Sequence, residues 1–204
     1  MTTKAVAVFD IDDVFFPLNE HVAKIAQVDY DKIVTYCALD NPLLNEADRR
    51  RLYQSYQTPG MHAKMDFYPG ARAFGVLARD PRLDPWLCSN SIDETVVQNK
   101  RYNLSEFLAE DYILFRQMLN IIGMENAHTK RFPDNIWLLF DDSPLNAIAS
   151  QAKHVLMPRR PWNISSWGVK TLEPIRSRVQ YYDGPEEACR MAAELMDKEL
   201  GHVF

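Results

Sequence analysis

The sequence predicts an α/β fold with a mostly parallel sheet, and three observations support this class. Short apolar runs alternate along the chain with longer stretches in which apolar residues recur at helical spacing. Two of the apolar runs, Ala5–Phe9 and Ile136–Phe140, are unbroken, as is typical of strands buried on both faces of a parallel sheet. Both runs end in acidic residues, which are Asp10, Asp12, Asp13, Asp141 and Asp142.

A helical insertion is expected directly after the first strand. Three amphipathic helices are predicted in it, over about residues 19–28, 33–39 and 45–56. Asp29 or Asp31 would cap the second helix, and the Asn-Pro pair at residues 41–42 would end it. We therefore expect a small helical cap over residues 17–66, while residues 1–16 and 67–204 form the α/β core domain.

The remaining chain is predicted to alternate between helices and strands. Strands are expected over about residues 85–88, 136–140, 154–157 and 179–182. Helices are expected over about residues 71–79, 93–100, 104–108, 144–152, 172–178 and 185–200, the last of them stopped by Gly201. Residues 111–122 fit a strand and a helix equally well.

Composition limits the classes of function. A hydrophobic fraction of 47% and a charged fraction of 25% are ordinary for a soluble globular protein, and a formal net charge of −5 argues against a nucleic-acid polymer as partner. The three cysteines lack metal-ligand spacing, and no apolar run is long enough to cross a membrane. We expect a cytoplasmic protein with reduced thiols and no membrane partner; a homodimer stays open.

The acidic residues at two strand ends predict a metal site. Since the carboxyl ends of parallel strands share one edge of the sheet, Asp10, Asp12 and Asp141 are expected to converge there. Crowded carboxylates repel one another unless a cation neutralises them, and oxygen ligands favour Mg²⁺. The alternatives are a solvated turn after the first strand and a helix N-cap supplied by Asp142 or Ser143.

A hydroxyl and a lysine complete this constellation. Ser89 follows the second predicted strand, where a hydroxyl beside free backbone N–H groups suits a phosphate oxygen; a turn or N-cap serine is the alternative. Lys130 stands eleven residues before Asp141 and can reach the acidic cluster as a point charge, unless it is a solvated surface lysine. Whether Lys130, Lys100 or Arg116 supplies this charge is left open.

In this order the residues resemble the four motifs of the haloacid dehalogenase-like (HAD) phosphatase superfamily. Its first motif is an apolar strand followed by D-x-D-x-V/T, here residues 10–14, and its second is a strand followed by Ser89. Its third is a lysine, best matched by Lys130, and its fourth is a strand followed by the acidic pair Asp141 and Asp142. The resemblance covers about residues 5–163 and implies a Rossmann-like three-layer core with a cap after the first strand.

Within that superfamily the chain looks most like the 5'(3')-deoxyribonucleotidase group. The similarity lies in Val14, in the spacing of Lys130 from the acidic pair, and in the Pro-Trp-Asn sequence at residues 161–163. The chain departs from the group at Asp13, where the group has glycine, and at positions expected near the base and sugar, which are residues 17, 18, 89–91 and 143.

The resemblance implies a role for each site residue. Asp10 would be the nucleophile that forms an aspartyl-phosphate, and Asp12 would protonate the leaving oxygen and then activate water. Mg²⁺ would be held by Asp10, by the backbone carbonyl of Asp12, by Asp141 and, through a water, by Asp142. The phosphoryl oxygens would be bound by Ser89, Asn90 and Lys130.

The implied activity is hydrolysis of a small phosphomonoester with Mg²⁺ as cofactor, with (deoxy)nucleoside monophosphates as one substrate class. A sugar phosphate or a phosphoprotein is the alternative substrate, and a non-catalytic binding protein with the same fold is the alternative function. Aromatic residues of the cap and its rim are candidates for substrate stacking, with ordinary packing as the competing interpretation. They are Tyr53, Tyr56, Phe67 and Tyr68.

Overall fold

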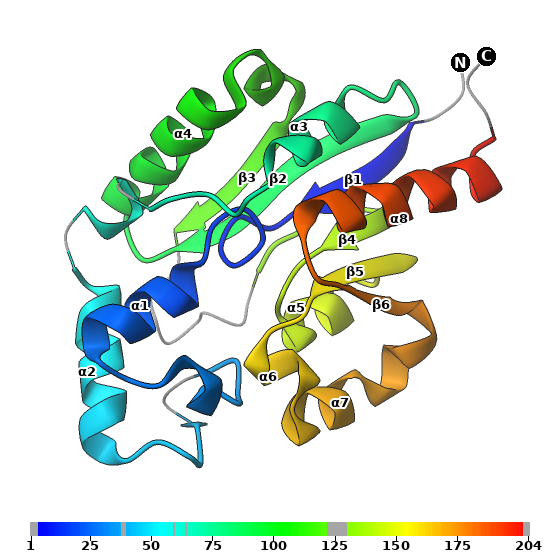
Figure 1. Ribbon diagram of the computed structural model, residues 1–204. Helices are drawn as coiled ribbons and strands as arrows, with labels where there is room; N and C mark the ends of the chain where they lie inside the picture. Colours follow the sequence, from blue (N-terminus) through cyan, green and yellow to red (C-terminus); the bar gives the residue numbers. More distant parts are fainter. Residues whose placement is uncertain (1–3, 38–39, 59, 64, 122–129, 202–204) are drawn as a thin grey trace.

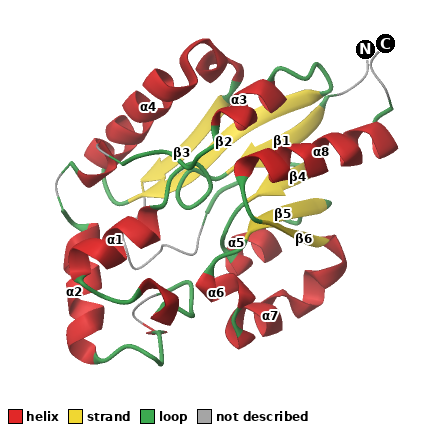
Figure 2. Ribbon diagram, in the orientation of Figure 1, coloured by secondary structure: helices red, strands yellow, loops and turns green. Residues whose placement is uncertain are grey.

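The computed structural model describes residues 4–37, 40–58, 60–63, 65–121 and 130–201, and six strands of this part form a single sheet (Figures 1 and 2). Their order is β3-β2-β1-β4-β5-β6, and every neighbouring pair is parallel. This is the strand order of a doubly wound Rossmann-like sheet, so the predicted fold class is confirmed. The strands are β1 Ala5–Phe9, β2 Leu83–Ser91, β3 Arg116–Ile121, β4 Ile136–Phe140, β5 His154–Pro158 and β6 Val179–Tyr182.

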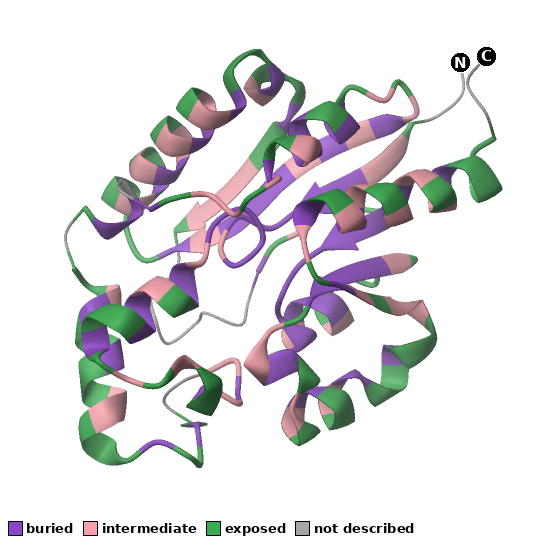
Figure 3. Cartoon of the chain, in the orientation of Figure 1, coloured by how far each residue is buried: buried purple, intermediate pink, exposed green. Residues whose placement is uncertain are grey.

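Apolar sequence places β1 and β4 side by side at the centre of the sheet. All five residues of β4 are buried, and Phe9 of β1 stacks on Phe140 of β4 with ring centroids 4.5 Å apart. Val8 and Leu139 point to the opposite face and join a second apolar cluster. Residues on both faces of these central strands are therefore buried, as the unbroken apolar runs predict, whereas the edge strand β3 is partly exposed (Figure 3).

Helices cover the two faces of the sheet. The cluster around Phe9 is completed by α3 Arg72–Ala78, α4 Glu94–Leu108 and α8 Pro185–Glu199. The cluster around Val8 is completed by α5 Pro144–Ala149 and α7 Ser166–Leu172. Among the described residues, no helix combines the length and apolar character needed to cross a membrane.

The strand order reverses between β1 and β4. From β1 the chain builds outward through β2 to β3, and then crosses to β4 and builds outward through β5 to β6. In such sheets a crevice opens beyond the carboxyl ends of the strands on either side of the reversal. The residues that follow β1 and β4 therefore face each other at the place where this architecture binds ligands.

The insertion after β1 lies beyond the carboxyl ends of the strands (Figure 1). It contains α1 Leu18–Ala26, the 3₁₀ turn η1 Tyr30–Lys32, α2 Glu46–Tyr56 and the 3₁₀ turn η3 Met61–Ala63. The chain returns beside its own point of departure, because Tyr68 N donates to the Phe15 carbonyl at 2.8 Å. That the insertion forms a separate cap domain over residues 17–66 stays a prediction.

The predicted helix over residues 33–39 is wrong. The Asp29 side chain accepts from Asp31 N and caps only the turn η1, after which residues 33–37 are irregular. Carbonyls that a helix would use accept side-chain donors instead: Lys32 O from Asn41 Nδ2 at 2.7 Å, and Val34 O from Ser165 Oγ at 2.8 Å. Contacts made by distant residues thus override the local periodicity; Leu39 lies outside the described residues.

Other predicted elements differ from the structure mainly in extent. The stretch over residues 93–108 is one helix, α4, which Asp93 caps by accepting from Val96 N at 2.9 Å. The ambiguous stretch divides into the 3₁₀ segment η4 Ala109–Leu114 and the strand β3, with Ile122 outside the described part. Residues 173–178 form a 3₁₀ segment, η6, rather than an α-helix, and α6 Pro161–Ile164 and α7 were not predicted.

His62 of the insertion is a buried histidine, with 7% of its surface exposed and its ring packed edge-on against Phe16. Burial lowers its pKa to about 4, against an ordinary value of 6.5. Above pH 6.5 the ring is neutral in both the folded and the unfolded chain. Below it the unfolded chain takes up a proton that the folded chain does not, so folding becomes less stable as the pH falls toward 4.

We expect His62 to contribute a loss of about 2 kcal/mol in unfolding free energy between pH 7 and pH 5. Urea unfolding at both pH values measures it, with His62→Gln as the comparison. The variant should lose correspondingly less stability over this interval. An identical pH dependence in both proteins would contradict a buried, neutral His62.

Candidate active site

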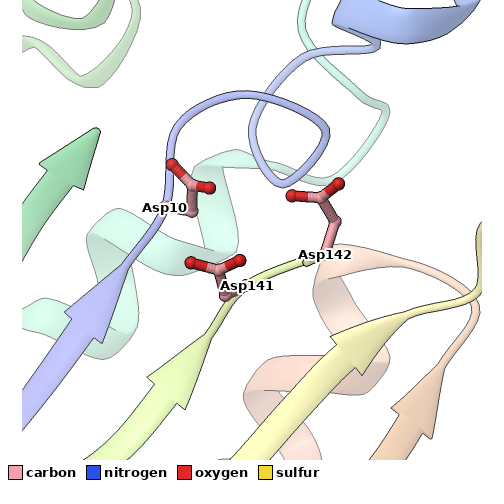
Figure 4. Close-up of side chains that lie close together, drawn as sticks. All are labelled: Asp10, Asp141 and Asp142. Carbon is pink, nitrogen blue, oxygen red and sulfur yellow. The ribbon is translucent and has the colours of Figure 1, made fainter. Parts of the chain in front are cut away.

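Three carboxylates meet at the carboxyl edge of β1 and β4 (Figure 4). Asp10, Asp141 and Asp142 each offer an oxygen within 4.8 Å of the others, and all three are buried. The sheet sets their positions: Asp10 N donates to Phe140 O at 2.8 Å, which extends the pairing of β1 and β4 by one residue. The structure therefore brings Asp10 and Asp141 together, as the shared sheet edge predicts.

Lys130 lies inside this carboxylate cluster. Its Nζ is 2.7 Å from Asp10 Oδ2 and 2.8 Å from Asp141 Oδ2, and 1% of its side chain is exposed. Burial lowers the pKa of Lys130, but the charges of Asp10 and Asp141 outweigh burial and raise it overall, so the ammonium stays charged. Arg116 instead stands at the amino end of β3, where it is exposed and pairs with Asp84.

Neighbouring donors hold Asp141 in a fixed orientation. Its Oδ1 accepts from Ser143 N at 2.9 Å, and Asn146 Nδ2 lies 3.1 and 3.2 Å from its two oxygens. The N-cap of α5 is Ser143, whose Oγ accepts from Asn146 N. Capping therefore does not account for the acidic pair. The role of Asn146 was missed, because its only signal in the sequence is its place in the first turn of a predicted helix.

The loop and short helix after β5 hold Asp142. Trp162 Nε1 donates to Asp142 Oδ2 at 3.1 Å, and Asn163 Nδ2 donates to the Asp142 carbonyl at 3.1 Å. Both side chains are fully buried. In the sequence, Trp162 and Asn163 are notable only for their similarity to a family motif. In the structure, both hold Asp142 through hydrogen bonds.

Asp12 belongs to a second cluster, beside the first. Its Oδ2 lies 2.5 Å from Lys100 Nζ and 3.4 Å from Ser89 Oγ. Lys100 also donates to Ser89 Oγ and to the Asn90 carbonyl, both at 2.9 Å. The Asp12 carboxylate is not part of the three-carboxylate cluster, so its predicted part in metal binding rests on its backbone carbonyl. The substrate-binding roles of Ser89 and Asn90 stay predictions.

Asp13 supports the turn that leads into the insertion. Its φ of 56° is in the left-handed region, which glycine adopts freely and aspartate tolerates better than most residues. Asn19 Nδ2 donates to its buried carboxylate at 2.6 Å. Its carbonyl accepts from Arg160 Nη2 at 2.7 Å, and that guanidinium stacks over the Tyr68 ring. These contacts explain how an aspartate is accommodated at this position, where the 5'(3')-deoxyribonucleotidase group that the sequence resembles has glycine.

The site contains more carboxylates than cationic side chains. Among the described residues that form it, five carboxylates face three cationic side chains, Lys100, Lys130 and Arg160. Burial raises the pKa of Asp10 to about 7, reinforced by Asp141 and Asp12 and opposed by Lys130. With all five carboxylates ionised the site would hold two excess negative charges, which a divalent cation would balance. The cation would also lower the pKa of Asp10 again. The oxygen-only donor set fits such an ion, so Asp10, Asp141 and Asp142 can hold a metal.

Three of the four aromatic residues predicted as candidates for substrate stacking are engaged in packing. Phe67 stacks on Phe107 with centroids 3.7 Å apart, and Tyr68 lies under Arg160. Tyr56 donates its hydroxyl to Asn19 Oδ1, and Tyr53 lies partly exposed on α2. These contacts favour the packing interpretation for Phe67, Tyr68 and Tyr56.

No protein-family model matches this sequence, and no curated protein matches it. Among solved structures, the chain is similar to a haloacid dehalogenase-like hydrolase from Burkholderia xenovorans LB400, at 16% identity and a TM-score of 0.45, over 96% of this chain and 99% of that one. It is also similar to L-2-haloacid dehalogenase from Xanthobacter autotrophicus, at 11% identity and a TM-score of 0.49, over 94% of this chain and 99% of that one.

We predict that Lys130→Met destabilises the metal-free protein by about 3 kcal/mol, because it leaves buried carboxylates without their counter-charge. Chemical unfolding in the presence of EDTA measures this change. Lys153→Met is the matched control: Lys153 pairs with Glu199 at 2.8 Å, but its side chain is 60% exposed, so its loss should change stability little. Equal effects of the two substitutions would contradict the importance of the Lys130 pair.

Proposed function

We propose that this chain is a Mg²⁺-dependent phosphatase of the HAD superfamily, which hydrolyses a small phosphomonoester through an aspartyl-phosphate. The observation that carries the proposal is the convergence of Asp10 with Asp141, Asp142 and Lys130 at the strand-order reversal of the sheet. A nucleophile, a metal site and a fixed positive charge in one place are what phosphoryl transfer requires.

In the first step, an Asp10 carboxylate oxygen attacks the phosphorus atom and the bond to the leaving oxygen breaks. Asp10 is held for this attack by Ile11 N, which donates to Oδ1 at 2.6 Å, and by Lys130 on Oδ2. Asp12 gives a proton to the leaving oxygen, so that a neutral alcohol departs. In the second step, Asp12 takes a proton from water, and the resulting hydroxide attacks phosphorus and releases phosphate from Asp10.

Positive charge is needed because an anionic phosphate must approach an anionic nucleophile. Mg²⁺, held by Asp10, Asp141 and Asp142 with the Asp12 carbonyl, would supply most of that charge. Lys130 adds a fixed charge beside Asp10, and Ser89 and Asn90 would bind a phosphoryl oxygen. These groups stabilise the charge that spreads over the phosphoryl oxygens in the transition state.

We propose (deoxy)nucleoside monophosphates as the first substrate class to test, in a cytoplasmic setting. This choice is supported by Val14, by the spacing of Lys130 from Asp141 and by residues 161–163. The packing of Phe67 and Tyr68 adds no support for a stacked base, so sugar phosphates and phosphopeptides belong in the same substrate panel.

We expect the purified protein to hydrolyse 4-nitrophenyl phosphate with Mg²⁺ and not with EDTA. Asp10→Asn should reduce turnover to the uncatalysed background while the protein stays folded, since the amide cannot act as the nucleophile. Asp183→Asn is the matched control. The ion pair described for Asp183 is an exposed one with Arg159, so this variant should keep full activity. Retained turnover in Asp10→Asn would contradict the assignment of the nucleophile.

Beryllium fluoride distinguishes an enzyme from a binding protein with the same fold. It mimics a phosphoryl group bound to an aspartate, so it should raise the melting temperature only when Mg²⁺ is present and only with Asp10 intact. Absence of this shift, together with absence of turnover on the substrate panel, would favour the non-catalytic alternative.

A further inference from the structure

Lys100 is a second buried lysine at the site, and the proposed reaction leaves it without a task. It lies on α4, and 1% of its side chain is exposed. Its ammonium group has three N–H donors and meets three acceptors: Asp12 Oδ2, Ser89 Oγ and the Asn90 carbonyl. All of its donors are therefore used within the protein, and Lys100 can act on a substrate only through the residues that it holds.

The first of these residues is Asp12. Lys100 fixes Oδ2 at 2.5 Å, whereas Asp12 Oδ1 is buried and has no hydrogen-bond partner in the described part of the chain. A carboxylate held by one oxygen cannot rotate freely, so the other oxygen keeps a constant direction. Oδ1 is therefore the oxygen of Asp12 that no described donor occupies, and it is the one that the proposed proton transfer would use.

The second residue is Ser89. Because Lys100 donates to Ser89 Oγ, the serine hydroxyl serves as an acceptor in that contact and keeps its own proton for another partner. The protein acceptors within its reach are Asp12 Oδ2 at 3.4 Å and Asn90 O at 3.3 Å, both long for an O–H donor. A phosphoryl oxygen placed beside Ser89 would offer a better acceptor.

We propose that Lys100 is a positioning residue of the phosphatase reaction. It directs Asp12 Oδ1 toward the leaving-group oxygen and frees the Ser89 hydroxyl for a phosphoryl oxygen, so that one ammonium group sets the acid and the phosphate-binding group together. This inference rests on the proposed function. It differs from the role of Lys130, which contacts the nucleophile itself.

The test compares two esters with Mg²⁺ bound to the full-length protein. Phenyl phosphate needs a proton on its leaving oxygen, and 2,4-dinitrophenyl phosphate does not. Lys100→Met should lower kcat/KM for phenyl phosphate about 100-fold, and this loss should exceed the loss on the dinitrophenyl ester by about tenfold. A purely structural loss would affect both esters by the same factor.

Two further variants keep the comparison decisive. Arg101→Met is the matched control on the same helix, because Arg101 bonds Gln117 rather than a site residue and should leave both rates unchanged. If Lys100→Met does not fold, Lys100→Gln, which retains N–H donors, is compared on the same two esters instead.

Equal losses on both esters with an active wild-type protein would overturn the role of Lys100 and leave the phosphatase proposal standing. An inactive wild-type protein would overturn the proposed function, and this role with it.

Discussion

The crowding of five carboxylates, four of them buried, at one edge of a parallel sheet is the constraint on which the rest of the structure depends. The fold requires that β1 and β4 be neighbours, and both strands continue directly into acidic residues. Apolar burial drives those strands together, and the acids are carried with them out of bulk water. Their repulsion must be balanced where they meet, because burial alone would favour their neutral forms.

Cationic side chains from three separate segments provide that balance. Lys130 precedes β4, Lys100 lies on α4 and Arg160 follows β5, and each bonds to a residue at the end of β1. These bonds connect the surrounding helix and loops to the segment that directly follows β1. The remaining negative charge is suited to a divalent cation.

The central strands and the meeting of their acids could be predicted because both follow from local sequence. Unbroken apolar runs specify β1 and β4, and parallel pairing then places Asp10 beside Asp141. The irregular segment over residues 33–37 could not be predicted, since Asn41 and Ser165 bind carbonyls that the periodicity assigns to a helix. The same holds for two partners of the acids, since Lys100 and Trp162 take their roles from tertiary contacts that no spacing in the sequence records. The contact of Asn146 with Asp141 is local, but its only signal in the sequence is a place in a predicted helix.

The central claim is that Asp10 and Asp141 share one cation. Crystals grown with Mn²⁺ in place of Mg²⁺ test it most directly, because manganese gives an anomalous diffraction signal at its own position. The account predicts an anomalous peak in contact with carboxylate oxygens of both Asp10 and Asp141. A crystal that holds manganese elsewhere or not at all, with Lys130 still bridging the two carboxylates, would contradict it.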